Sequence, residues 1–99
     1  MELIEKKGKQ IVKINGEINQ ETVDEFNAYL GNANDMPLIF EMSRVENITM
    51  KGISELIRTA NEYYFKTGRR INIFKPSKSS MNIFETVGLI NIFNFSQVA

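Results

Sequence analysis

The sequence predicts an α/β domain in which a mixed, mainly parallel four-stranded sheet begins with an antiparallel hairpin and is flanked by three helices. Segments rich in Ile, Leu, Val and Phe alternate with segments whose apolar residues recur every three or four positions, which is typical of strands alternating with helices. A glycine, the residue type preferred just past a helix end, follows each helical segment as Gly31, Gly68 or Gly88. The 99 residues suit one hydrophobic core, so we expect a single domain over residues 1–99.

Strands are predicted in a hairpin and in two later segments. Residues 3–6 and 11–15 flank a Lys-Gly-Lys turn at residues 7–9. Residues 38–42 are apolar on both faces at their start, which favours a central strand covered by helices on at least one side. Residues 71–74 form the next strand. The order of elements is therefore β-β-α-β-α-β-α, and strands joined by helices pair in parallel.

The first helix is predicted over residues 20–30, capped by Asn19, and the third over residues 78–87. Spacings of three and four place the apolar residues of each helix on one side, which we expect to face the core. These residues are Val23, Phe26 and Leu30 in the first helix, and Met81, Phe84 and either Ile83 or Val87 in the third, with Leu89 packing just past its end.

The second helix is predicted over residues 50–67. Residues 63–65 are three consecutive aromatic residues, and a helix cannot bury all of them. Tyr64 is expected to point inward and Tyr63 toward solvent. The predicted core face is Ile53, Leu56, Ile57, Ala60 and Tyr64.

Composition excludes several classes of function. Lys plus Arg number 12 and Asp plus Glu number 12, so no net charge attracts nucleic acid. Cysteine and histidine are absent, which excludes disulfides, zinc sites built on thiolate or imidazole, and histidine general-base catalysis. No apolar run approaches the roughly 20 residues that cross a bilayer. We expect no cofactor, no direct membrane insertion and a cytoplasmic location.

Four segments carry a resemblance to a known family. Residues 14–19 look like its Gly-Glu-Leu-Asp segment, and residues 38–48 look like its Val-Leu-Asp-Leu-Ser central strand. Residues 67–77 resemble the segment that ends in an Asn-Pro-Ser-like turn, and residues 88–93 resemble the closing Gly-Leu-Asp-x-Val-Phe. In this order and spacing, the motifs resemble the STAS (anti-sigma-factor antagonist) family, which implies a STAS-like fold.

The resemblance also implies a departure from the family. Its members enter helix two through an Asp-Ser-Ser-Gly motif, whose second serine is phosphorylated by a partner kinase. Aligning this motif on Gly52 places Thr49, Met50 and Lys51 at its first three positions. Lys51 stands at the phospho-acceptor position and has no hydroxyl, so we expect a divergent member without the usual switch. The family's fourth, C-terminal helix is also expected to be missing, because the chain stops at Ala99.

The start of the second helix breaks local rules even without the resemblance. Thr49 suits an N-cap, but the helix dipole repels Lys51 at a cost of about 0.3–1 kcal/mol. Gly52 costs about 1 kcal/mol relative to alanine. Such clusters often mark functional surfaces, and the alternative is an ordinary exposed helix start. The predicted partner-binding residues are Asn19, Gln20, Thr49, Met50, Lys51, Ser54, Glu55 and Arg58.

Hydroxyl groups at two helix starts have alternative roles. Thr49 is either a cap or an alternative phosphosite, and we favour the cap. A serine cluster at the start of the third helix either binds an anion beside two lysines or caps the helix, and we again favour capping. The cluster comprises Ser77, Ser79 and Ser80, beside Lys75 and Lys78.

Two surface features follow from the same pattern. A basic edge is interpreted as solvated surface rather than a nucleic-acid site. An apolar patch is expected where a fourth helix would pack, which would favour a weak homodimer. The edge comprises Lys66, Arg69, Arg70, Lys75 and Lys78, and the patch comprises Phe93, Phe95 and Val98.

Three functions remain as hypotheses. The first is a non-enzymatic regulatory module that binds an anti-sigma kinase-like protein through the start of helix two. The alternative is a small STAS-like subunit of a membrane (lipid) transport ATPase assembly. The third is an enzyme with Lys51 as nucleophile, which its exposed position disfavours because an amine needs burial to lose its proton at neutral pH.

Overall fold

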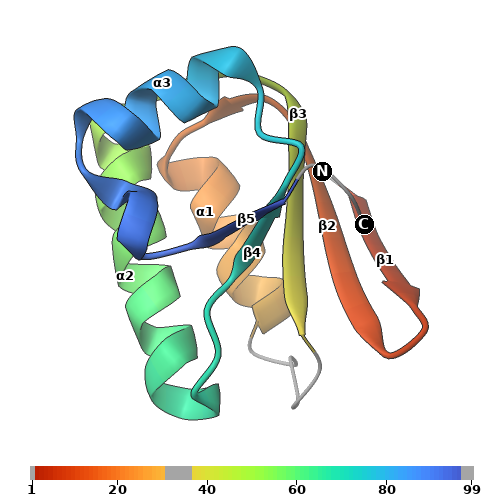
Figure 1. Cartoon of the computed structure of the whole chain (residues 1–99). Coiled ribbons are helices and arrows are strands. Elements are labelled where there is room, and N and C mark those ends of the chain that lie inside the picture. Colours follow the sequence, from red (N-terminus) through yellow and green to blue (C-terminus); the bar gives the residue numbers. More distant parts are fainter. Residues whose placement is uncertain (1, 31–36, 97–99) are drawn as a thin grey trace.

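The computed structural model describes residues 2–30 and 37–96 (Figure 1). Strands and helices alternate along the chain after an initial hairpin, as predicted. In chain order the elements are β1 (Glu2–Lys6), β2 (Lys9–Ile18), α1 (Gln20–Leu30), β3 (Leu38–Ile48), α2 (Met50–Thr67), β4 (Asn72–Phe74), α3 (Lys78–Thr86), a short 3₁₀-helix η1 (Leu89–Asn91) and β5 (Asn94–Ser96).

The sheet is mixed and mainly parallel. Its strand order is β1-β2-β3-β4-β5, in which only the β1–β2 pair is antiparallel. Lys7 and Gly8 both adopt positive φ, at 51° and 75°. A two-residue hairpin turn whose twist matches that of the strands requires positive φ at both positions. The predicted hairpin and the parallel crossovers are therefore confirmed.

The prediction of four strands is wrong, because β5 adds a fifth. This strand has three residues and pairs in parallel with β4. The Asn94 amide donates to the Ile71 carbonyl at 3.1 Å, and the Lys75 amide donates to the Ser96 carbonyl at 2.8 Å. With one half-buried apolar residue, Phe95, the strand is too short to show an alternating pattern in the sequence.

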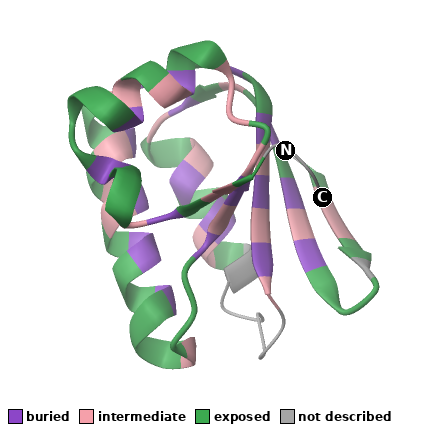
Figure 2. Cartoon of the chain, in the orientation of Figure 1, coloured by how far each residue is buried: buried purple, intermediate pink, exposed green. Residues whose placement is uncertain are grey.

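All three α-helices pack on the same face of the sheet (Figures 1 and 2). The buried row across the sheet includes Val12, Phe40 and Ile73, which are register partners on neighbouring strands. Phe26 of α1 stacks on Phe40 with ring centroids 4.8 Å apart. Residues on the other face, such as Ile39, are half-buried because no described element covers them. The central strand is thus covered on one side.

The buried face of α2 is rotated from the predicted one. Tyr63 is buried at 5% exposure, whereas Tyr64 is 54% exposed, so the inward and outward tyrosines were assigned the wrong way round. The buried stripe also contains Gly52 and Thr59, which an apolar pattern does not detect. The Thr59 hydroxyl donates to the Asn27 amide oxygen of α1 at 3.2 Å, so a polar contact shifts the helix face.

The C-terminal segment fills the space predicted to be open. Phe93 is buried, Phe95 is half-buried, and both contact Phe84 of α3 with ring centroids 5.6 and 5.7 Å away. The predicted apolar patch is therefore wrong for these residues. Val87 is exposed, because α3 ends at Thr86, and Ile83 takes the inward position. Gly31, Val98 and the Leu30 side chain lie outside what the structure describes.

Replacing Phe40 with alanine tests the position of the core. Phe40 is fully buried, so Phe40→Ala is expected to lower the free energy of unfolding by roughly 3–5 kcal/mol in urea denaturation. The matched control is Phe65→Ala, because Phe65 is 92% exposed and its loss should change stability by less than about 0.5 kcal/mol. Equal effects of the two variants would contradict the arrangement.

Candidate functional site

Helix α2 begins at a sharp corner after β3, and Thr49 joins it to the neighbouring strand. The Thr49 hydroxyl accepts from the Gly52 amide at 3.0 Å, which satisfies one free donor of the first turn. The Thr49 amide donates to the Ile18 carbonyl at the end of β2 at 2.9 Å, and the hydroxyl lies 3.4 Å from the same oxygen. The predicted cap is confirmed, and the hydroxyl has two partners.

Gly52 allows the first turn of α2 to lie directly against the end of β2. A Cβ atom at this position would lie 2.4 Å from the Ile18 carbonyl oxygen, a distance that real contacts do not show. The glycine is buried inside the helix, so its cost in helix propensity is offset by this close packing. In the sequence, Gly52 was noted as unfavourable inside a helix. The physical reason for a glycine at this position is the close packing against β2.

Helix α1 begins beside the same carbonyl. The Asn19 side chain caps α1 by accepting from the Thr22 amide at 3.0 Å. The Asn47 side chain of β3 donates to the Glu17 carboxylate of β2 at 3.3 Å, which ties the two strand ends together. The starts of α1 and α2 therefore form one connected corner around Ile18.

The corner and the first turns of α2 bring together the residues predicted from the sequence. Met50 is 81% exposed although it is apolar, and Gln20, Lys51, Ser54 and Arg58 are exposed as well. Met50, Ser54 and Arg58 follow one another at spacings of four and so share one side of the helix. We call this set the corner surface, and its members are Asn19, Gln20, Thr49, Met50, Lys51, Ser54, Glu55 and Arg58.

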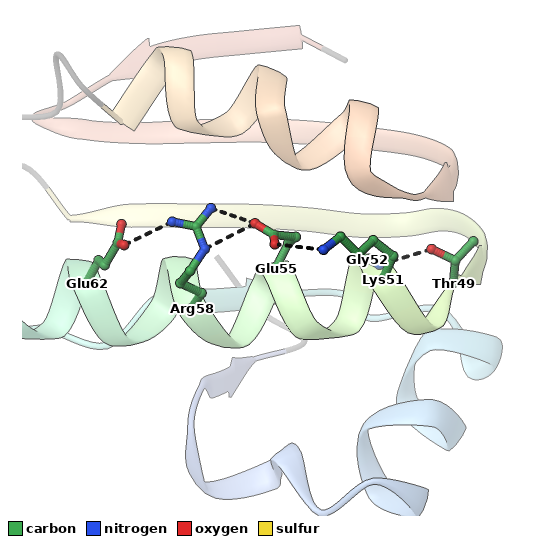
Figure 3. A network of polar contacts seen from close by, with 6 residues as sticks. All are labelled: Thr49, Lys51, Gly52, Glu55, Arg58 and Glu62. Atoms are coloured by element: carbon green, nitrogen blue, oxygen red, sulfur yellow. Dashed lines mark hydrogen bonds and ion pairs between the residues drawn. The ribbon is translucent and has the colours of Figure 1, made fainter.

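A ladder of ion pairs runs along α2 from its first turn (Figure 3). Lys51 Nζ lies 3.6 Å from Glu55 Oε1, and Arg58 Nε donates to Glu55 Oε2 at 3.1 Å. Arg58 Nη1 continues the ladder by donating to Glu62 Oε1 at 3.0 Å. Hydrogen bonding to Arg58, supported by the charges of Arg58 and Lys51, holds the pKa of Glu55 below its ordinary value of 4.5. Glu62 is not among the residues predicted from the sequence, although its spacing of four from Arg58 was a usable signal.

The ladder gives Lys51 a compensating contact. A cation in the first turn of a helix is disfavoured by the partial positive charge there. Glu55, one turn further on, supplies the opposite charge, and its side chain is only 14% exposed. The two residues therefore hold each other in place on the corner surface.

The other predicted hydroxyl cluster has a structural role. Ser77 caps α3 by accepting from the Ser80 amide at 3.1 Å, and its hydroxyl donates to the Val45 carbonyl at 2.6 Å. The Ser80 hydroxyl is buried and donates to the Ser77 carbonyl at 3.0 Å. These groups serve the cap and the connection to β3, and Ser79 is exposed.

The described residues give no basis for a metal site or a membrane span. Within residues 2–30 and 37–96, no group of three or more acidic side chains is placed to hold a metal ion. None of the helices described there combines the length and the apolar character that a membrane span needs.

Substituting Gly52 tests the close packing at the corner. On an open helix, Gly52→Ala would stabilise by about 1 kcal/mol through propensity. Against the Ile18 carbonyl it should instead lower the free energy of unfolding by roughly 1–3 kcal/mol. Ser54→Ala, in the same helix but exposed, is the control and should change stability by a few tenths of a kcal/mol at most. A stabilising Gly52→Ala would refute the packing.

The ladder predicts a dependence on pH. A carboxylate whose pKa is lowered by folding stabilises the fold above its unfolded pKa, and this contribution is lost as pH falls through the folded value. Wild type should therefore exceed Glu55→Gln in unfolding free energy from about pH 5 upward, and the difference should vanish on acidification. Urea denaturation across this range measures it, and about 1 M NaCl should reduce it. A difference that does not change with pH would contradict the ladder.

One comparison with known proteins identifies the family. A family model of the STAS domain matches residues 1–98, whereas no curated protein matches the chain. STAS domains are generally non-enzymatic regulatory modules and commonly mediate protein–protein interaction. The sheet topology, with its antiparallel first pair followed by parallel strands, agrees with this family. With this fold and a match over nearly its whole length, the chain belongs to the STAS domain family.

Proposed function

We propose that this chain is a cytoplasmic regulatory module that binds a protein partner through the corner surface. The observation that carries the proposal is Met50, an apolar side chain left 81% exposed on a backbone that is held from several directions. Thr49 and Gly52 fix the turn on which Met50 stands, through their contacts with the Ile18 carbonyl. Binding there orders one side chain and little backbone, which keeps the entropic cost of association low.

Met50 would supply the apolar centre of the contact. Covering a methionine side chain contributes about 1.5–3 kcal/mol, which corresponds to a 10- to 100-fold change in affinity. Its thioether adapts to irregular pockets, a property common at binding surfaces. We infer that the partner offers an apolar pocket facing the first turn of α2.

The charged residues around Met50 would set the orientation of the partner. Lys51 and Arg58 keep more than half of their side chains exposed while they pair with Glu55. Exposed charges at a rim contribute more to specificity and association rate than to affinity. The partner is therefore expected to place carboxylates opposite Lys51 and Arg58.

The complex is proposed to form without the usual serine phosphorylation switch. Lys51, aligned with the family's acceptor serine, carries an amine that pairs with Glu55. Thr49 is the alternative acceptor, but its hydroxyl is engaged with Gly52 and Ile18. Phosphorylating Thr49 would replace the cap that starts α2. These contacts support a complex that is constitutive or controlled in another way.

Two partner classes fit the corner surface. An anti-sigma kinase-like protein is the one we propose, and a transport ATPase is the alternative. Pull-down from the native cell with mass spectrometry identifies which class binds. If the chain co-purified with a membrane complex and this depended on Met50, the transport ATPase would be the partner in place of the kinase-like protein.

A charge at position 50 tests the surface itself. Met50→Glu should weaken partner binding at least 10-fold, because it places a charge where apolar contact is needed. Glutamate in the first turn is favoured by the helix dipole, so folding stability should not fall. The matched control is Phe65→Glu, because Phe65 is 92% exposed near the other end of α2 and should leave binding unchanged. Affinity is measured by isothermal titration with the purified partner.

The reverse pattern would overturn the proposal. If Phe65→Glu abolished binding and Met50→Glu did not, the contact would lie near the C-terminal end of α2. A separate incubation with ATP and the partner kinase tests whether phosphorylation regulates the complex. Stoichiometric phosphate on Thr49 or a neighbouring hydroxyl would refute the unswitched complex and leave the docking surface intact.

A further inference from the structure

A concave feature lies at the opposite end of α2 from the corner surface. It is a shallow pocket of about 580 Å³, lined by residues at the end of α2 and at the starts of β4 and β5. Figure 1 shows where these elements lie. Its volume falls within the roughly 300–1,000 Å³ of small-molecule sites. Its lining includes Pro37, Tyr64, Arg69, Arg70, Asn72 and Asn94.

The described lining of the pocket contains two arginines and no carboxylate. Residues 63–84 contain five cations and no acidic residue, although the whole chain is neutral. In the part of the chain that the structure describes, every ion pair lies between residues 51 and 62, so Arg69 and Arg70 form none there. The end of α2 adds about half a negative charge, which two full guanidinium charges exceed.

The predicted basic edge is divided by the fold. Arg69 and Arg70 precede β4 at the pocket, whereas Lys75 and Lys78 follow it at the other end of the strand. Lys75 follows Arg70 by five positions along largely extended chain, which corresponds to about 17 Å at 3.3 Å per position. The arginines therefore act apart from the lysines, at a single small site.

The remaining wall offers an apolar surface and hydrogen-bonding groups. Tyr64 is 54% exposed, so its ring is accessible, and the half-buried Pro37 lies on the same lining. Asn72 and Asn94 are register partners on neighbouring strands. Among the described hydrogen bonds, neither carboxamide takes part in one, so both can contact a ligand.

We propose that this pocket binds a small soluble phosphate monoester with a flat organic group. Guanidinium groups match phosphoryl oxygens in charge and geometry, so Arg69 and Arg70 would hold the dianion. The Asn72 and Asn94 carboxamides donate hydrogen bonds to its remaining oxygens, and the organic group lies against the Tyr64 ring. This site is separate from the corner surface, and its occupancy does not depend on Met50.

Phenyl phosphate is a suitable probe, because it combines both parts of the proposed ligand. Amide NMR titration should show saturable shifts at residues 68–72 and at Asn94, with a dissociation constant on the order of 1 mM. Inorganic phosphate should bind at least threefold more weakly, and phenol should not bind. The combined variant Arg69→Gln/Arg70→Gln should weaken phenyl phosphate at least 10-fold. Lys75→Gln/Lys78→Gln is the matched control and should bind as wild type.

Two further experiments test the aromatic contact and the source of the phosphate. Tyr64→Ala should weaken phenyl phosphate but leave inorganic phosphate unchanged, which separates the aromatic contact from the anion contact. Sedimentation with phosphatidylglycerol vesicles tests whether a lipid headgroup is the source of the phosphate. Three results would each overturn a soluble monoester site. The arginine variant could bind phenyl phosphate as tightly as wild type, or the shifts could centre on Lys75 and Lys78. The third is arginine-dependent binding to vesicles alone.

Discussion

The close approach between Gly52 and the Ile18 carbonyl is the contact on which the site depends. It brings the first turn of α2 onto the end of β2, where the Thr49 amide donates to the same oxygen. Since α1 starts two residues past Ile18, the two helices begin side by side. The Ile18 carbonyl thus holds the start of α2 beside that of α1, which Asn19 caps, and Met50 is left exposed.

Much of the fold could be predicted because its signals are local. The bounds of α1 and α2 follow from apolar spacing together with capping residues such as Asn19 and Thr49, and the structure agrees at each end. The rest depends on contacts between distant residues. Thr59 is buried because it meets Asn27, which turns Tyr63 rather than Tyr64 inward. β5 forms because the edge of β4 is free to pair with it. A strand of three residues is too short to be recognised from the sequence pattern.

Some residues of the candidate site hold the fold together, and others are free to contact a partner. Thr49 and Gly52 looked unusual in the sequence, and both have structural reasons in the cap and the packing. Lys51 also looked unfavourable, and Glu55 compensates it. What remains without a structural reason is the exposure of Met50. Packing against Ile18 could not be foreseen, because thirty-four positions separate it from Gly52 and only the parallel pairing of β2 with β3 brings them together.

Amide hydrogen exchange at Thr49 tests the central contact most directly. Its N–H donates to the Ile18 carbonyl at 2.9 Å across the corner, outside the repeating hydrogen bonds of the helix. The arrangement described here predicts that this amide is protected to the same degree as the core amide of Phe40 in β3. Exchange as fast as that of an exposed turn amide, such as Gly8, would show that the corner opens freely and would contradict the rigid platform beneath Met50.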